Sequence, residues 1–159
     1  MKTEKELEEA IELYANMVRK ICFIHMKQEC DVDDIFQTVF FKYANASSFQ
    51  SLEHEKAWLI RVTINTCKDS LNSWFRKNAI LQDDFENLYT ENIVEDSIVL
   101  QAVLTLPPKY RDVIYLYYYE GYKIHEIAKI LNKKENTIHT WMKRAKERLR
   151  DIIGGDDFE

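Results

Sequence analysis

Glycine and proline are scarce in this chain, and their scarcity constrains the fold more than any other feature. Among 159 residues there are three glycines and two prolines. Both residues interrupt helices and form tight turns, so a chain with few of them has long stretches that can continue as helix. In the first such stretch, apolar residues recur at three- and four-residue steps, at Leu7, Ile11, Tyr14, Val18, Ile21 and Ile24. We therefore expect an all-α protein.

The helical periodicity falls into two blocks. The patterns predict helices over about residues 4–27, 32–44, 53–77, 109–119, 124–131 and 135–153. Between the blocks the sequence is acidic and lacks clear periodicity, and Pro107 and Pro108 then open the second block. We predict two small helical domains, residues 4–78 and 97–153, joined by a flexible acidic linker over residues 79–96.

The net charge of −5 conceals one basic block. Residues 109–150 carry 11 basic and five acidic groups, a balance of +6, whereas residues 81–108 carry six acids and no lysine or arginine. An acidic chain would ordinarily be a poor partner for nucleic acid, but a basic block of this kind favours it.

Cysteine usage and hydropathy exclude several classes of protein. The three cysteines form no CxxC motif, and Cys22, His25 and Cys30 lack an evident fourth zinc ligand. We expect buried thiols, with no disulfide scaffold, metal or cofactor. No apolar run approaches the roughly 20 residues of a membrane span, and the first ten residues are acidic rather than signal-like. These patterns predict a cytoplasmic protein without membrane insertion.

An acidic cluster precedes the second predicted helix, in the stretch DVDDIFQTVFFKYA. Its acids suit a helix start, with Asp31 as N-cap and Asp33 and Asp34 in the first turn. The apolar stripe of this helix comprises Val32, Ile35, Phe36, Val39 and Tyr43. Phe41 lies opposite that stripe, beside Asp34, Gln37 and Thr38. This face is either ordinary polar surface or a partner-binding face.

The same acids raise an enzymatic alternative, in which the DxDD spacing supplies a proton donor or magnesium ligands. A metal pair would require a second carboxylate cluster facing the first, and Asp83 and Asp84 lie in the predicted linker with no basis for convergence. We therefore expect no enzymatic activity and no small-molecule substrate.

The third predicted helix has two distinct lines of side chains. Its core stripe comprises Ala57, Ile60, Ile64, Cys67, Leu71 and Phe75. About 100° around the helix lies a second line, Trp58, Arg61, Asn65, Lys68, Asn72 and Arg76. Cations contact phosphates, amides bond to base edges and aromatics stack on unpaired bases, so this line fits single-stranded nucleic acid. The alternative is a solvated face with Trp58 half-buried against the preceding loop.

The basic block has the pattern of a helix-turn-helix. Ile124, Ile127, Ala128 and Leu131 form the inner side of its first helix, and Asn132 suits a left-handed C-cap. In the second helix, Ile138, Trp141, Met142, Ala145 and Leu149 face inward, while Asn136, His139, Thr140, Lys143 and Arg144 face outward. Outward polar residues near the start of such a helix are typical of major-groove recognition. Further cations, Lys133, Lys134, Lys146, Arg148 and Arg150, are candidates for phosphate contact; a basic hairpin that binds only protein is the alternative.

Taken together, the two blocks resemble the extracytoplasmic-function sigma factors of bacterial RNA polymerase. DVDDIFQTVF and AWLIRVTINTCKDSL are similar to motifs of sigma region 2, D-x-[ED]-D-[LI]-x-Q-x-x-F and A-W-L-x-R-[IV]-x-x-N. In the second block, LPPKYRDV and NTIHTWMKRA are similar to the region 4 motifs L-P-x-x-x-R-x-V and T-[VI]-x-[ST]-x-x-x-R-A. The resemblance covers most of residues 7–150.

The resemblance implies roles for individual residues. Polymerase would be bound by Asp34, Gln37 and Phe41. The melted minus-ten element would be bound by Trp58, Arg61, Asn65, Lys68, Asn72 and Arg76, with the loop from Ala46 to Lys56 holding a flipped base. The minus-thirty-five duplex would be read by Lys134, Asn136, Thr137, His139, Thr140, Lys143 and Arg144. The implied partners are core RNA polymerase, promoter DNA and, by family habit, an anti-sigma protein.

The resemblance also has departures. Family members often have Arg or Lys at the position of His139 and a second Arg at that of Trp141, so we expect modest DNA affinity for the chain alone. The alternative function from a different class is a stand-alone, dimeric helix-turn-helix regulator, which would bind two half-sites about one helical turn apart without polymerase.

Overall fold

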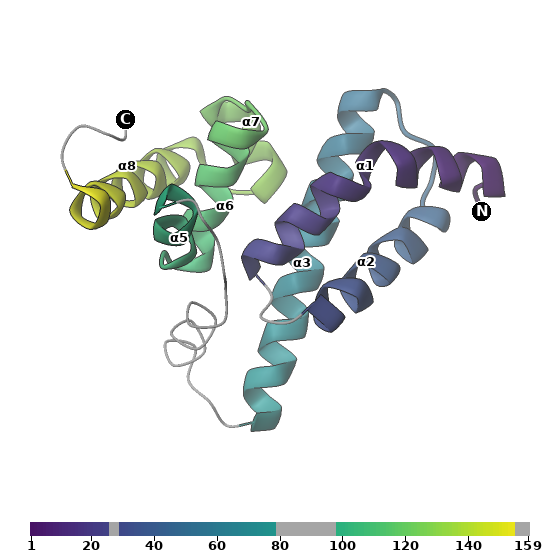
Figure 1. Ribbon diagram of the computed structural model, residues 1–159. Helices are drawn as coiled ribbons and strands as arrows, with labels where there is room; N and C mark the ends of the chain where they lie inside the picture. The colour runs from purple at the N-terminus through teal and green to yellow at the C-terminus, as the bar shows by residue number, and fades with distance from the viewer. Residues whose placement is uncertain (26–28, 79–97, 155–159) are drawn as a thin grey trace. The chain divides into compact units, whose positions relative to one another are not determined.

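The computed structural model describes residues 1–25, 29–78 and 98–154, and all regular secondary structure in these ranges is helical (Figure 1). The all-α prediction is confirmed. The chain divides into two compact units, which we call unit 1, Met1–Ile80, and unit 2, Leu81–Glu159. The predicted acidic linker, residues 79–96, lies outside the described residues. None of the described helices is long and apolar enough to cross a lipid bilayer.

Unit 1 contains three helices that pack against one another: α1 (Glu4–His25), α2 (Glu29–Ala44) and α3 (Leu52–Asn78). Each contributes the apolar stripe that its periodicity predicts. The fully buried apolar side chains of this unit include Val18, Ile21, Val39, Leu59 and Ile60. Ser51 begins α3 as its cap, since its hydroxyl accepts a hydrogen bond of 3.1 Å from the backbone N–H of His54.

Helix α2 begins at Glu29, three residues before the predicted start, so the assignment of Asp31 as N-cap is wrong. Asp31 instead lies within the first turn. Acidic residues are favoured both at the N-cap and in the first turn, so the residue type alone does not distinguish these positions. Partial burial, and then the nearby charge of Asp34, raise the pKa of the Asp31 carboxyl.

Unit 2 contains α5 (Ile98–Leu104), α6 (Pro108–Ile114), the π-helical turn η1 (Tyr115–Tyr119), α7 (Ile124–Leu131) and α8 (Glu135–Ile153). The helix predicted over 109–119 is therefore α-helical only in its first part. The N–H of Glu120 bonds to the carbonyl of Tyr115 at 3.2 Å, and the Tyr115 hydroxyl donates to Oε2 of Glu120 at 2.5 Å. These two bonds close the wider turn that ends the helix.

The turn between α7 and α8 has the geometry that Asn132 predicts. Asn132 adopts the left-handed conformation, with φ 56° and ψ 51°. The N–H of Lys133 bonds to the carbonyl of Ala128 at 2.9 Å, and that of Asn132 to the carbonyl of Lys129 at 3.3 Å. Together they form a Schellman motif, which satisfies carbonyls that the end of α7 leaves open.

Arg111 is the one arginine of the basic block with a fully buried side chain, 2% exposed, among the residues the structure describes. Its Nε donates a hydrogen bond of 2.7 Å to the carbonyl of Leu106. Leu106 is itself buried in the connection between α5 and α6. The arginine of the LPPKYRDV motif therefore holds this connection and belongs to the core of unit 2.

We expect Arg111→Met to destabilise unit 2 by about 2–4 kcal/mol, because the Leu106 carbonyl would be left buried without its charged donor. Urea unfolding of the full chain, followed by circular dichroism, measures this change. Arg144→Met is the matched control, since Arg144 is exposed and its loss should cost no more than about 0.5 kcal/mol. Equal urea midpoints for the two variants would contradict a structural role for Arg111.

Candidate nucleic-acid and partner interfaces

The outward side of α2 carries the three residues expected to bind polymerase. Asp34, Gln37 and Phe41 are all exposed, and the Phe41 side chain is 71% exposed. The opposite side of the helix is buried, at Val32, Ile35, Val39 and Tyr43. Phe41 is thus a large apolar side chain that the fold of unit 1 does not use.

The three acids of the DxDD stretch lie in different surroundings. Asp33 accepts a hydrogen bond of 3.0 Å from Nη1 of Arg19, whose guanidinium lies 4.4 Å from the ring centre of Phe36. This ion pair is about half exposed on both sides and contributes at most about 1 kcal/mol. Asp31 is half-buried, and Asp34 faces outward. Among the described side chains, no group of three His, Cys, Asp or Glu residues is arranged to hold a metal ion.

The polar line of α3 is exposed along most of its length. Arg61, Asn65, Lys68 and Asn72 are all exposed, while Ile60, Ile64, Cys67 and Leu71 are buried on the core side. At 1.5 Å per residue, the exposed part spans about 17 Å along the helix. Arg76 continues the line in sequence, but its side chain lies outside the described part of the structure.

Trp58 begins this line and differs from the other members because its ring is half-buried. The ring centre lies 5.3 Å from that of Phe49 and 6.3 Å from that of Tyr43. Trp58 therefore packs against the loop that precedes α3, as expected if it is a half-buried residue at the edge of a solvated face. Its aromatic contacts support that loop from the side of α3.

The loop between α2 and α3 is anchored by an aromatic cluster that the sequence pattern did not predict. The Phe49 ring stacks on Tyr43, with centres 5.9 Å apart, and meets His54 edge to face at 5.4 Å. The Tyr43 hydroxyl donates to Oε2 of Glu55 at 2.9 Å. Burial, and then this hydrogen bond, raise the pKa of Tyr43 far above its ordinary value, so the hydroxyl remains a donor. The sequence feature that could have indicated this cluster is Phe49, the one aromatic residue in the polar stretch NASSFQSLE.

The outward side of α8 carries the residues expected to read duplex DNA. Lys134 at the N-cap, and Asn136, His139, Thr140, Lys143 and Arg144 beyond it, are all exposed, whereas Thr137 is half-buried. The Thr140 hydroxyl donates to the carbonyl of Asn136 at 3.0 Å. The core side of the helix is buried at Ile138, Met142, Ala145 and Leu149.

Other cations of the basic block lie over aromatic rings of unit 2. The Lys146 ammonium is 5.6 Å from the ring centre of Tyr117, and the Arg148 guanidinium is 5.3 Å from that of Tyr110. The Lys109 ammonium lies 5.5 Å from the ring centre of Trp141. These contacts stabilise the packing of α6 and η1 against α8. Lys109, Lys146 and Arg148 thus have a structural role, unlike the exposed cations at the N-terminal half of α8.

Family models match both units. The model described as sigma-70 region 2 matches residues 10–78, and the model described as sigma-70, region 4 matches residues 96–149. The extracytoplasmic-function sigma factor SigW of Bacillus subtilis is 26% identical over 158 residues, which cover 88% of this chain and 84% of the relative. The sigma factor SigV of the same organism is 27% identical over 143 residues, covering 87% of this chain and 86% of the relative.

Solved structures share the fold. The sigma factor RpoE of Bartonella quintana, solved with the anti-sigma factor NepR, aligns with a TM-score of 0.71 at 17% identity, covering 94% of this chain and 97% of that one. CnrH, solved with the cytosolic domain of CnrY, aligns with a TM-score of 0.65 at 19% identity, covering 95% of this chain and 89% of that one. With region 2 and region 4 matched in order, this chain belongs to the sigma factors of bacterial RNA polymerase, in the extracytoplasmic-function group.

Proposed function

We propose that this protein binds core RNA polymerase and directs it to promoters, with unit 1 on the melted minus-ten element and unit 2 on the minus-thirty-five duplex. The proposal rests on two exposed rows of polar side chains, each of which lies in a part of the chain that a sigma-factor model matches. We call them the α3 stripe (Arg61, Asn65, Lys68 and Asn72) and the α8 stripe (Lys134, Asn136, His139, Thr140, Lys143 and Arg144). The α3 stripe lies in the part matched to region 2, and the α8 stripe lies in the part matched to region 4.

In unit 1, the α3 stripe provides the groups that a single strand requires. Arg61 and Lys68 are exposed cations that can neutralise phosphates, and Asn65 and Asn72 are exposed amides that can bond to base edges. The loop from Ala46 to Lys56 adjoins this helix and would receive a base flipped out of the stack. Flipping costs a few kcal/mol, which contacts in the loop would offset.

In unit 2, α8 has the form of a recognition helix. The B-DNA major groove is about 12 Å wide and admits one α-helix, which presents the side chains near its N-terminus to base edges. Asn136 and Thr140 would bond to bases, while Lys134, Lys143 and Arg144 would contact base edges or phosphates. These roles require no chemistry from the chain itself, in keeping with a family of non-enzymatic initiation factors.

The exposed face of α2, comprising Asp34, Gln37 and Phe41, is proposed as the polymerase interface. Aromatic side chains, phenylalanine among them, are enriched at the centres of protein interfaces. An anti-sigma protein is the further partner we expect, since one structural neighbour, RpoE, was solved with the anti-sigma factor NepR, and it would cover the same faces. We expect the protein to act in the cytoplasm, because bacterial promoter DNA lies there. The match of residues 10–78 to region 2 does not favour a stand-alone regulator.

Transcription reconstituted with core polymerase tests the proposed function. We expect the purified chain to start transcripts at defined positions on a pooled genomic template, each downstream of two conserved elements. Core polymerase without the chain is the control and should start at none of these positions. Footprints that form without polymerase, at two half-sites about one helical turn apart, would instead indicate the stand-alone regulator.

Phe41→Ser should weaken binding to core polymerase at least tenfold, about 1.4 kcal/mol or more, because a buried interface aromatic would be lost. The fold of unit 1 should be unaffected, since the side chain is 71% exposed. Leu13→Ser is the matched control, because Leu13 is an exposed apolar residue of α1, 62% exposed. Fluorescence titration of core polymerase measures the affinity of both variants. If Phe41→Ser weakens binding no more than Leu13→Ser does, Phe41 is not part of the interface.

Arg144→Ala should make the salt dependence of promoter binding shallower, by about one in the slope of log K against log salt, if Arg144 neutralises a phosphate. Arg148→Ala is the matched control, because Arg148 lies in the same helix as Arg144 but its guanidinium lies over the ring of Tyr110 in α6. The measurement uses reconstituted holoenzyme on a promoter duplex over a series of salt concentrations. An unchanged slope for Arg144→Ala would assign the residue to base contact or to structure.

A further inference from the structure

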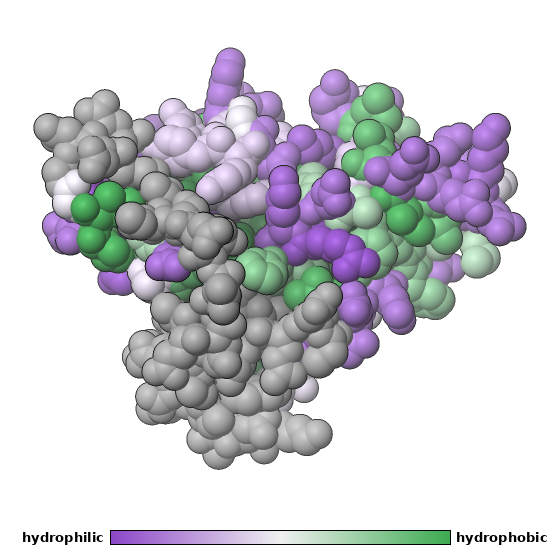
Figure 2. Space-filling view, viewed as in Figure 1, coloured by the Kyte–Doolittle hydropathy of each residue, from purple (hydrophilic) through white to green (hydrophobic). Residues whose placement is uncertain are grey.

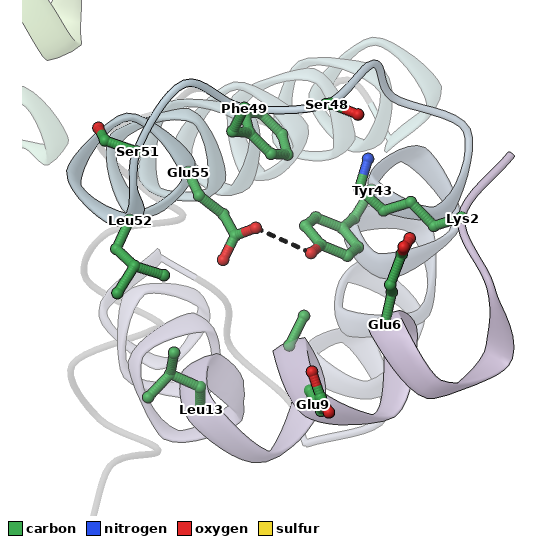
Figure 3. A pocket seen from close by; sticks show the side chains of 11 residues that line it. Lys2, Glu6, Glu9, Leu13, Tyr43, Ser48, Phe49, Ser51, Leu52 and Glu55 are labelled. Atoms are coloured by element: carbon green, nitrogen blue, oxygen red, sulfur yellow. Dashed lines mark hydrogen bonds between the residues drawn. The ribbon is translucent and has the colours of Figure 1, made fainter.

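Lys2 connects the N-terminus of the chain to the end of α2 and to the loop that follows it. Its backbone N–H donates to the carbonyl of Ala44 at 2.9 Å. Its ammonium donates to the carbonyls of Ala46 at 2.7 Å and Ser47 at 3.2 Å. The same ammonium lies 4.8 Å from the ring centre of Tyr43 and 4.9 Å from that of Phe49. Figure 3 shows the Lys2 side chain extending from the N-terminal segment across Tyr43.

These contacts meet a local need of the backbone. The last carbonyls of a helix have no partners within the helix, and a cation near that end also complements the helix dipole. Helix α2 ends at Ala44 without a glycine to form a left-handed cap. Its last turn is closed by bonds from the Asn45 N–H to the Lys42 carbonyl, from the Ala46 N–H to the Tyr43 carbonyl, and from Nδ2 of Asn45 to the Phe41 carbonyl at 2.9 Å. Lys2 therefore satisfies carbonyls that neither the helix nor the loop satisfies alone.

The loop lies beside a cavity of about 460 Å³, so close packing against α1 does not fix it. Glu6, Glu9 and Leu13 line this cavity from α1, and Tyr43 from α2. Ser48 and Phe49 line it from the loop, and Ser51, Leu52 and Glu55 from the start of α3. Two residues of its lining, Leu13 and Leu52, are exposed leucines. Figure 2 shows hydrophobic residues among hydrophilic ones on the face of unit 1 that is turned to the viewer. Among the described residues, the Phe49 ring and the Lys2 side chain anchor residues 46–49, while the Asn45 side chain bonds back to the Phe41 carbonyl of α2.

We propose that Lys2 is a positioning residue for promoter melting: it holds the loop after α2 in the shape that receives the flipped minus-ten base. The inference rests on the proposed function, in which this loop and the α3 stripe engage the melted strand. Lys2 acts through the backbone carbonyls of Ala46 and Ser47, and its ammonium is already occupied by these carbonyls and two aromatic rings.

Loss of Lys2 should lower base discrimination at the minus-ten element. A loop that is competent for only a fraction of the time reduces the affinity for its ligand by that fraction. Promoters whose minus-ten base fits the loop would lose that contribution, whereas promoters with a poorly fitting base have little to lose. The ratio between the two classes should therefore fall, by roughly three- to tenfold if two charge-assisted hydrogen bonds at a partly exposed site are removed.

The first test measures the loop itself in the free, full-length chain. We expect Lys2→Met to speed amide hydrogen exchange over residues 45–51 by about three- to tenfold, as the loop opens more often. Lys2→Arg keeps a cation with a long stem and should exchange nearly as the wild type does. Lys5→Met is the matched control, since Lys5 is exposed in α1 and no hydrogen bond or ring contact joins it to the described residues. Unchanged exchange in Lys2→Met would overturn the proposal.

The second test measures promoter melting with core polymerase and a promoter library randomised at the minus-ten element, with any purification tag at the C-terminus. With Lys2→Met, the difference in open-complex yield between the best and the poorest promoters of the library should become smaller. The affinity for core polymerase and the salt dependence of promoter binding should stay unchanged. A uniform loss with a slope shallower by about one would indicate direct phosphate contact and overturn the positioning role. If the wild type melts no promoter, the proposed function fails; if it does and Lys2→Met has the same spread, only the role of Lys2 fails.

Discussion

Unit 1 depends on the buried side of α3, against which both α1 and α2 pack. Leu59 and Ile60 are wholly buried there, and each such side chain contributes about 1.5–3 kcal/mol by leaving water. A rotation of α3 by one residue, 100°, would bring the charged Arg61 to the place where Ile60 is now buried. The core therefore fixes which side chains of α3 face outward. Because the apolar side of the helix must be buried against α1 and α2, the polar side must face the solvent. The same holds for α8, where Ile138, Ala145 and Leu149 are fully buried.

The candidate surfaces consequently need little beyond the helical register. Arg61, Asn65, Lys68 and Asn72 recur at three- and four-residue steps, as do the buried residues beside them. Nucleic acid would meet a row of side chains held by one rigid element rather than by a flexible loop. The loop after α2 is the exception, and there the chain supplies separate supports: the aromatic cluster of Tyr43, Phe49 and Trp58, and the N-terminal Lys2.

Features encoded by neighbouring residues could be predicted from the sequence, and features that join distant residues could not. The bounds of α7 and α8 follow from local signals, Asn132 at one end and Gly154 at the other, and both have the predicted limits. The start of α2 was misplaced, because an aspartate suits both the N-cap and the first turn of a helix. The burial of Arg111 was not predicted, since nothing local marks an arginine as buried. Lys2 bonds to carbonyls 44 and 45 residues away, a pairing that no periodicity contains.

The left-handed turn at Asn132 bears on the kinetics of DNA encounter. With both backbone bonds of the Schellman motif formed, α7 and α8 are joined by only two residues beyond Asn132 before the next helix begins. So short a tether leaves α8, the proposed recognition helix, almost no freedom to reorient, so the entropy of aligning it would be lost during folding rather than on binding DNA. Association should then be governed by diffusion and by long-range attraction to the phosphates, with no slow conformational step in unit 2.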